Sequence, residues 1–146
     1  MSSFTSELWV SPLPDGRRWK LLRSFSYHVG SRNSRQVIKV PKGRETDFAS
    51  IPKIFLPLLP FWAKYSKPSP IHDELYRVKA IMGKPITRKK ADRVFLEAML
   101  TDFKSHKQGK AVAYLEYWAV RLFGWLSWHK PKRHLTRNSN PQRGQI

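Results

Sequence analysis

The segment from Thr87 to Phe103 reads TRKKADRVFLEAMLTDF and carries the clearest secondary-structure signal in the chain. Its apolar residues recur every three or four positions, which puts them on one side of a helix. Thr87 precedes the first basic turn and has a side chain suited to cap it. The apolar stripe consists of Ala91, Val94, Phe95, Ala98, Met99 and Phe103. We therefore expect a helix that packs this stripe into a core.

Two more helices are expected on either side of this segment. The first should begin with Ser69 as N-cap and Pro70 at the first helical position, and end near Gly83. The other should run from about Lys110 to Trp128. Its stripe is expected to face the core and consists of Ala111, Leu115, Trp118, Leu122 and Leu126, widened by Val112, Ala119 and Phe123.

The sequence before these helices favours strands. Trp19 to Val29 alternates at period two, and Gln36 to Val40 is a second short apolar run, so the two predict an antiparallel hairpin. Residues 1–18 are predicted to be an irregular lead-in, and the proline-rich residues 53–70 a wrapping segment with at most one helical turn. The predicted fold is α+β, with one globular domain over residues 19–130 and a disordered basic tail over residues 131–146.

Composition narrows the function classes. The 146 residues include 28 Lys and Arg against 10 Asp and Glu, which gives a formal charge of +18. Such a charge attracts anionic polymers, namely nucleic acid, lipid headgroups or cell-wall polymer. The absence of cysteine excludes disulfides, a thiol nucleophile and Cys-based metal sites. We expect no transmembrane segment, because residues 111–128 contain Glu116 and Arg121, and we find no signal-peptide pattern at the N-terminus.

The densest chemical signal is His72-Asp73-Glu74-Leu75-Tyr76, followed by Asp92 on the next helix. A carboxylate that bonds one imidazole nitrogen leaves the other free to take a proton from water, so His72, Asp92 and Tyr76 are candidate catalytic residues. Their contact is not automatic. In antiparallel helices His72 and Asp92 would lie at opposite ends, unless the first helix is short or the connection folds back.

Metal binding is an alternative role for the acidic residues. Asp73 and Asp47 could hold Ca²⁺ through oxygen ligands, whereas a His with two carboxylates would suit Zn²⁺, Mn²⁺ or Fe²⁺. The same residues also have structural uses. Asp73 suits a helix N-terminus, Asp47 can cap a nearby amide, and Asp92 can pair with Arg88 or Arg93.

A second candidate site is basic. Lys130, Lys132, Arg133 and Arg137 follow Trp125 and Trp128 near the C-terminal end. Aromatic rings beside cations suit an anionic interface, so these residues are predicted to bind an anionic polymer.

Four motifs resemble a known family. They are Val40-Pro41-Lys42-Gly43 with Thr46-Asp47-Phe48-Ala49-Ser50-Ile51-Pro52, then His72-Asp73-Glu74-Leu75-Tyr76, then Arg88-Lys89-Lys90-Ala91-Asp92-Arg93-Val94-Phe95, and then Tyr117-Trp118-Ala119-Val120-Arg121-Leu122-Phe123-Gly124. In this order they resemble the phage and prophage family catalogued as domain of unknown function 1353, over about residues 19–128. Arg44 stands where that family usually has an aromatic residue. The resemblance implies a bacteriophage origin and a place in the virion or the host cytoplasm.

The site residues are also similar to those of small bacterial and viral phospholipases of the A2 type. That similarity implies that His72 activates water, Asp73 holds Ca²⁺ and Asp92 orients His72. The glycine-rich calcium loop of those enzymes has no counterpart before His72.

Three functions are open at this point. The first is a metal-dependent hydrolase with a His base that acts at the host cell envelope during entry or lysis. The second is a non-enzymatic virion or nucleic-acid-associated protein, which would also contact other virion subunits. The third is a host-takeover inhibitor that binds an acidic host protein.

Overall fold

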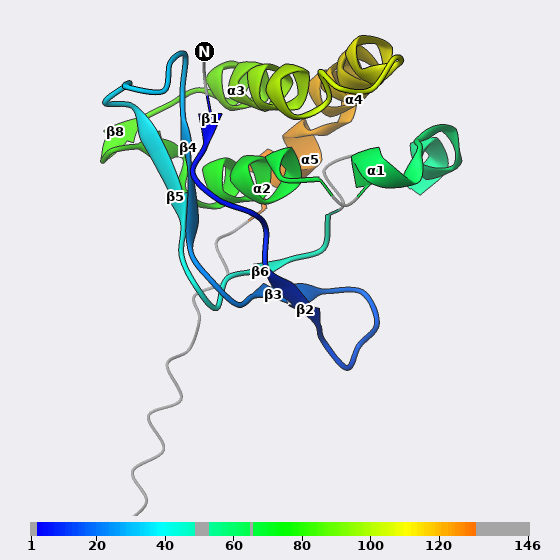
Figure 1. Cartoon of the computed structure of the whole chain (residues 1–146), viewed down its shortest axis with the longest axis horizontal. Helices are drawn as coiled ribbons and strands as arrows, with labels where there is room; N and C mark the ends of the chain where they lie inside the picture. The colour runs from blue at the N-terminus through cyan, green and yellow to red at the C-terminus, as the bar shows by residue number, and fades with distance from the viewer. Residues whose placement is uncertain (1–2, 49–52, 65, 131–146) are drawn as a thin grey trace, which may run out of the picture.

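The computed structural model describes residues 3–48, 53–64 and 66–130, and it combines small antiparallel sheets with helices (Figure 1). The α+β class predicted from the sequence is therefore confirmed. The predicted basic tail lies outside the described residues, and so do Ala49 to Pro52.

Two three-stranded sheets form the N-terminal part of the molecule. The first contains β1 (Ser3–Phe4), β4 (Phe25–His28) and β5 (Val37–Val40) in the order β1-β4-β5. The second contains β2 (Val10–Pro12), β3 (Trp19–Leu21) and β6 (Glu45–Thr46) in the order β2-β3-β6. The predicted hairpin is present as the antiparallel pair β4–β5.

Two predictions about this part were wrong. The expected strand from Trp19 to Val29 is split into β3 and β4, which belong to different sheets. The lead-in is not irregular, because β1 pairs with β4 and β2 pairs with β3. Such short strands lack the length over which alternation can be recognised.

The segment between the sheets and the helices also differs from its prediction. It contains a 3₁₀ helix, η1 (Lys53–Leu58), and a short α-helix, α1 (Phe61–Lys64), where at most one helical turn was expected. Both pack against the end of the molecule formed by α3 (Arg88–Asp102) and α4 (Gly109–Phe123).

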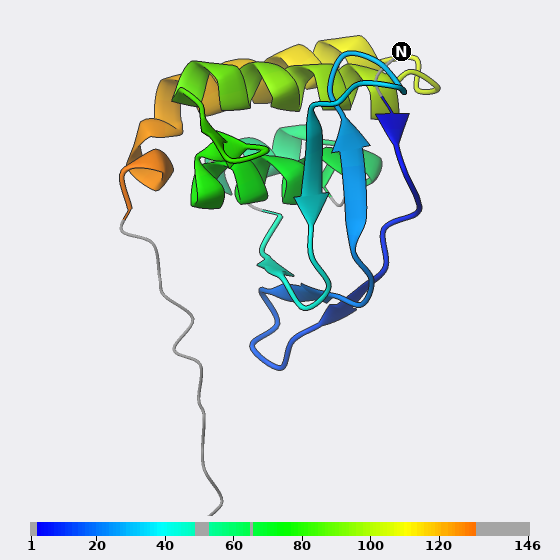
Figure 2. The same cartoon turned by 90° about the vertical axis from the view of Figure 1, so that its left-hand side faces the viewer.

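The first long helix is shorter than predicted. It is α2 (Pro68–Val78), it follows Lys67 rather than a Ser69 cap, and it ends where Lys79 turns to φ 56°. A small hairpin of β7 (Ala80–Ile81) and β8 (Lys84–Pro85) then returns the chain to α3. Figure 2 shows α2 and α3 one above the other, with β4 and β5 beside them.

The helix predicted from the segment Thr87 to Phe103 is confirmed. The Thr87 hydroxyl accepts the Lys90 N–H at 3.2 Å, and every residue of the predicted stripe from Ala91 to Phe103 is buried. Gly109 is needed for the turn from α3 to α4, because a Cβ there would lie 2.1 Å from the Phe103 carbonyl oxygen.

Only part of the stripe predicted on the last helix faces the core. Val112, Ala119 and Val120 are buried, whereas Leu115, Trp118 and Leu122 are 38%, 58% and 64% exposed. The helix is also divided at Gly124 into α4 and the short α5 (Trp125–Trp128). The stripe was misassigned because the helix is apolar on almost every side, so that periodicity could not indicate which side faces the core.

Candidate functional site

His72 and Asp92 are in direct contact in the interior. His72 Nε2 lies 2.9 Å from Asp92 Oδ1, and the two residues are 2% and 0% exposed. The early end of α2 explains the contact. His72 lies six residues before Val78, about 9 Å along the axis, and Asp92 lies in the second turn of α3. The sequence analysis required a short first helix for this contact, and α2 is short enough.

Asp92 accepts hydrogen bonds on both carboxylate oxygens. Oδ1 also accepts the Tyr76 hydroxyl at 2.6 Å. Oδ2 accepts Arg121 at 2.8 Å and Arg88 at 3.3 Å. Side chains from α2, α3 and α4 thus converge on one carboxylate. We call His72, Tyr76, Arg88, Asp92 and Arg121 the Asp92 cluster.

Of the two arginines in this cluster, the sequence analysis predicted one and missed the other. Arg88 was expected as one structural partner of Asp92, and it also donates to the carbonyl oxygens of Val120 and Arg121, at 3.1 and 3.2 Å. The other expected partner, Arg93, is exposed. Arg121 was not predicted to be part of the site. Its only signal was its position in the last family motif.

The cluster keeps Asp92 ionised. Burial alone would raise the pKa of Asp92, but the hydrogen bonds from His72, Tyr76 and Arg121 outweigh it and lower that pKa. The pKa of Tyr76 is raised, by burial and by Asp92, so its hydroxyl stays protonated. An ionised carboxylate accepts hydrogen bonds only, so Nε2 of His72 carries the proton. In the neutral ring Nδ1 is then the basic nitrogen.

Aromatic rings fix the orientation of His72. Its ring stacks on Phe95 with centroids 4.3 Å apart and lies 4.2 Å from the Tyr76 ring. Tyr76 in turn meets Trp128 edge-on at 5.2 Å. A Cβ at Gly124 would come within 2.4 Å of the Tyr76 hydroxyl oxygen, so a glycine is required beside the site.

Asp73 belongs to a separate group of residues. Its Oδ2 accepts the Thr46 hydroxyl at 2.5 Å, and Asp47 is close enough to repel it. Burial and the Asp47 charge raise the pKa of Asp73 to about 6. Asp47 itself is exposed. The structure therefore brings Asp73 and Asp47 together, beside the Asp92 cluster in sequence but with different partners.

Salt bridges connect α2 to the strand segment that contains Thr46. Glu74 Oε2 lies 2.8 Å from Arg44 Nε, and Glu74 also pairs with Arg77 at 3.4 Å. Arg77 donates to the Glu45 carbonyl oxygen at 3.2 Å. Arg44 thus anchors this segment to α2 through Glu74.

The two carboxylates do not form a complete metal site among the described residues. Ca²⁺ takes six to eight oxygen ligands, and one oxygen of Asp73 is already occupied by Thr46. No group of three or more His, Asp and Glu side chains suited to a metal ion occurs within residues 3–48, 53–64 and 66–130. The described residues at this position therefore supply too few ligands for the predicted cation.

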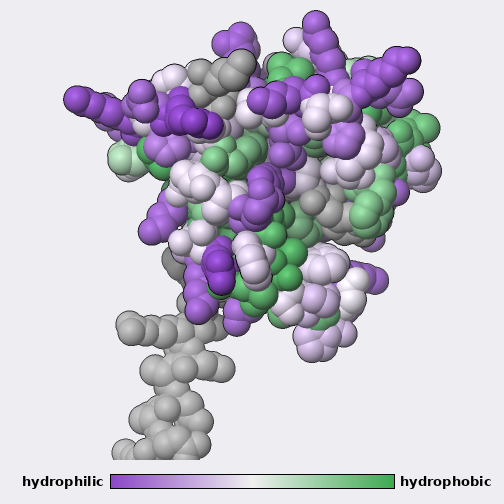
Figure 3. Space-filling view, in the orientation of Figure 1, coloured by the Kyte–Doolittle hydropathy of each residue, from purple (hydrophilic) through white to green (hydrophobic). Residues whose placement is uncertain are grey.

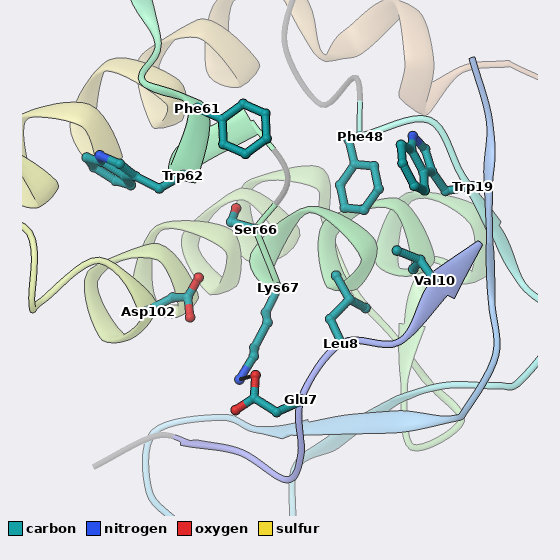
Figure 4. Close-up of a pocket in the computed structure, with 10 residues that line it drawn as sticks. All are labelled: Glu7, Leu8, Val10, Trp19, Phe48, Phe61, Trp62, Ser66, Lys67 and Asp102. Carbon is teal, nitrogen blue, oxygen red and sulfur yellow. Dashed lines mark ion pairs between the residues drawn. The ribbon is translucent and has the colours of Figure 1, made fainter. Parts of the chain in front are cut away.

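An apolar cleft of about 560 Å³ lies next to this region (Figure 4). Aromatic and aliphatic side chains make most of its wall, and the Lys67–Glu7 ion pair at 3.2 Å stands at one side. Phe48 lines it, only two residues after Thr46. Asp47 and Asp73 are not among the lining residues, so the backbone from Thr46 to Phe48 connects this pair to the cleft.

The predicted anionic-polymer site can be placed only in part. Lys130 is exposed just after α5, whereas Lys132, Arg133 and Arg137 lie outside the described residues. No helix of the described residues is long and apolar enough to cross a membrane.

A comparison with known protein families gives one match. The model described as "Protein of unknown function (DUF1353)" matches residues 19–120. The chain belongs to this family. The DUF1353 match covers His72, Tyr76, Arg88 and Asp92, and it ends one residue before Arg121. No curated protein and no solved structure matches the chain significantly.

Proposed function

We propose that this protein is a bacteriophage hydrolase that acts at the host cell envelope during entry or lysis, with His72 as the proton acceptor. The observation that supports this proposal is the His72–Asp92 contact at 2.9 Å, with Tyr76 on the same carboxylate oxygen. The charge of +18 supports action at an anionic envelope.

The proposed chemistry is general base catalysis. Nδ1 of His72 takes a proton from a water molecule as that water attacks a carbonyl or phosphoryl centre. Asp92 then stabilises the imidazolium that forms, because its carboxylate stays ionised against Nε2–H. The bond to the leaving group then breaks, and the imidazolium returns the proton to the leaving group. Tyr76, Arg88 and Arg121 hold Asp92 in place. Since His72 is 2% exposed, the reaction requires a local opening that admits water and substrate.

The roles proposed for the acidic pair follow from its surroundings. Asp73 accepts the Thr46 hydroxyl and lies beside Asp47, and Phe48 of the same segment lines the apolar cleft. We assign these residues to positioning the segment that lines the cleft. Binding of Ca²⁺ or another divalent cation to them would require oxygen ligands beyond those of the described residues.

One experiment tests this proposal directly. The purified protein is incubated with phospholipid vesicles and with purified peptidoglycan, each with EDTA, Ca²⁺, Mg²⁺, Mn²⁺ or Zn²⁺, and product release is measured. We expect the His72→Gln variant to lose at least about a hundredfold in rate, the usual contribution of a general base. His129→Gln is the matched control, because His129 is exposed at the end of α5. An unchanged rate for His72→Gln would refute the proposal.

A non-enzymatic virion or nucleic-acid-associated protein is the second candidate. The specific observation in its favour is the saturation of Asp92 by four donors at a fully buried position, which is also what a structural cluster requires. In that case His72→Gln lowers only the stability, and binding to DNA falls steeply with salt concentration.

A further inference from the structure

The outer face of the last two helices is apolar and uncovered. Leu115, Trp118 and Leu122 on α4, and Trp125 and Leu126 on α5, are between 38% and 64% exposed. We call these five residues the apolar ridge. On α4 they are spaced three and four positions apart, so they share one side of the helix. Helices that are apolar on every side are normally buried, so this exposure needs a partner.

The apolar surface continues beyond the ridge onto η1. Phe123 at the end of α4 contacts Phe55 with ring centroids 5.8 Å apart. Two neighbours of Phe55 on η1, Ile54 and Leu58, are 78% and 65% exposed. In Figure 3, apolar surface is visible on the right-hand side, near the position of α1 in Figure 1.

The exposed charges in the part of the sequence that contains the ridge have one sign. Between Phe103 and Lys130 the only acidic residue is Glu116, which points into the core and is 3% exposed. Burial raises the pKa of Glu116 to about 8, so it is mostly neutral at pH 7. Four exposed lysines stand in the same stretch, namely Lys104, Lys107, Lys110 and Lys130. Lys53 adds another exposed cation at the start of η1.

We propose that the apolar ridge docks onto the surface of an anionic phospholipid bilayer. Trp and Leu side chains enter the boundary between headgroups and acyl chains, while the surrounding lysines pair with lipid phosphates. Charge decides against a second copy of this chain as the occupant, since two molecules of +18 repel each other. It also decides against a basic protein partner. Nucleic acid would satisfy the lysines and stack on the indoles, but it offers nothing apolar to Leu115, Leu122 and Leu126.

The docked orientation would place the Asp92 cluster near the bilayer. Arg121 and Trp128, which contact Asp92 and Tyr76, lie on the same two helices as the ridge. The inference does not depend on hydrolysis, because binding can be measured in a protein whose His72 is replaced.

The experiment measures binding to vesicles of phosphatidylglycerol and phosphatidylcholine, and to vesicles of phosphatidylcholine alone. Sedimentation with the vesicles gives the partition coefficient, and quenching of tryptophan by acyl-brominated phosphatidylglycerol reports insertion. We expect the wild type to bind the anionic vesicles with quenching, and the Trp118→Gln/Leu122→Gln variant to bind at least about tenfold more weakly. The control variant is Leu22→Gln/Met82→Gln, which removes exposed apolar side chains that are 44% and 66% exposed on other elements and should bind like the wild type.

Several results would overturn the inference. One is equal binding by wild type and ridge variant, which would leave charge alone as the cause. Another is a wild type that binds DNA but not vesicles and loses DNA affinity in the ridge variant. A third is self-association in sedimentation velocity that the ridge substitutions abolish. Quenching in the wild type keeps the test valid even if the ridge variant folds poorly. The proposed function fails separately, through the rate of His72→Gln.

Discussion

Replacing Asp92 with asparagine should be among the most destabilising conservative changes in this protein. The carboxylate is fully buried and accepts four hydrogen bonds, two on each oxygen. Asparagine has nearly the same shape but carries one NH₂ group. If that group faces the two arginines, it meets donors only; if it faces His72 and Tyr76, the imidazole must change tautomer and the hydroxyl must rotate to accept from it. In both orientations Arg88 and Arg121 keep their charges without a counter-charge.

The magnitude follows from these contacts. Each hydrogen bond to a charged group contributes about 1.5–3 kcal/mol, and breaking a buried ion pair by removing one partner costs about 3–5 kcal/mol. We expect Asp92→Asn to lower the free energy of unfolding by about 3–5 kcal/mol. That is a large part of the roughly 5–15 kcal/mol typical of whole domains.

Urea unfolding followed by far-UV circular dichroism measures this change. The matched control is Asp15→Asn, because asparagine can keep the bonds to the backbone of Arg17 and Arg18, and the ion pair with the Arg18 side chain is exposed and contributes little. The control should unfold at the same urea concentration as the wild type. A loss below about 1 kcal/mol for Asp92→Asn would refute the reasoning, since it would mean that the four contacts contribute little.

Three further substitutions give separate tests. Gly124→Ala should displace the Tyr76 hydroxyl, because the new Cβ would lie 2.4 Å from it, and thermal unfolding should detect the loss of stability. Glu116→Gln should remove a pH dependence of the stability. Folding raises the pKa of Glu116 from 4.5 to about 8, so the wild-type free energy of unfolding falls as pH rises through this window, by at most about 5 kcal/mol. The variant should therefore be the more stable protein at pH 9. Asp73→Asn should behave similarly between pH 4 and 6, because the pKa of Asp73 is raised to about 6, and it should relieve the repulsion by Asp47 at pH 7. A melting temperature for Asp73→Asn that falls with rising pH relative to the wild type would contradict this account.

The helix from Arg88 to Asp102 could be predicted well because local signals agreed. A cap, a single apolar stripe and a polar opposite side all point to the same helix, and the structure buries every stripe residue. The same reasoning succeeded only in part for α4. Val112 and Ala119 face inward as predicted, but the stripe is not unique, and only tertiary packing decides that Trp118 and Leu122 face outward.

The candidate site was predictable in its members on α2 and α3 but not in its geometry. The contact between His72 and Asp92 depends on α2 ending at Val78, where Lys79 adopts a left-handed conformation, and on a two-strand hairpin too short to show alternation. Arg121 was missed because its link to Asp92 spans 29 positions, which no local pattern encodes. The pairing of Asp73 with Thr46 likewise depends on how β6 packs against α2.

The most direct test of the central claim compares two variants of matched burial. His72→Gln removes the basic nitrogen, whereas Phe95→Leu disturbs the ring stacked on His72 and leaves that nitrogen in place. Initial rates on phosphatidylglycerol vesicles and on peptidoglycan are measured at a temperature where circular dichroism shows both variants folded. If His72 is the proton acceptor, the His72→Gln rate falls by at least about a hundredfold and the Phe95→Leu rate stays within about tenfold of the wild type. Equal losses in the two variants would show instead that His72 serves only to stabilise the fold.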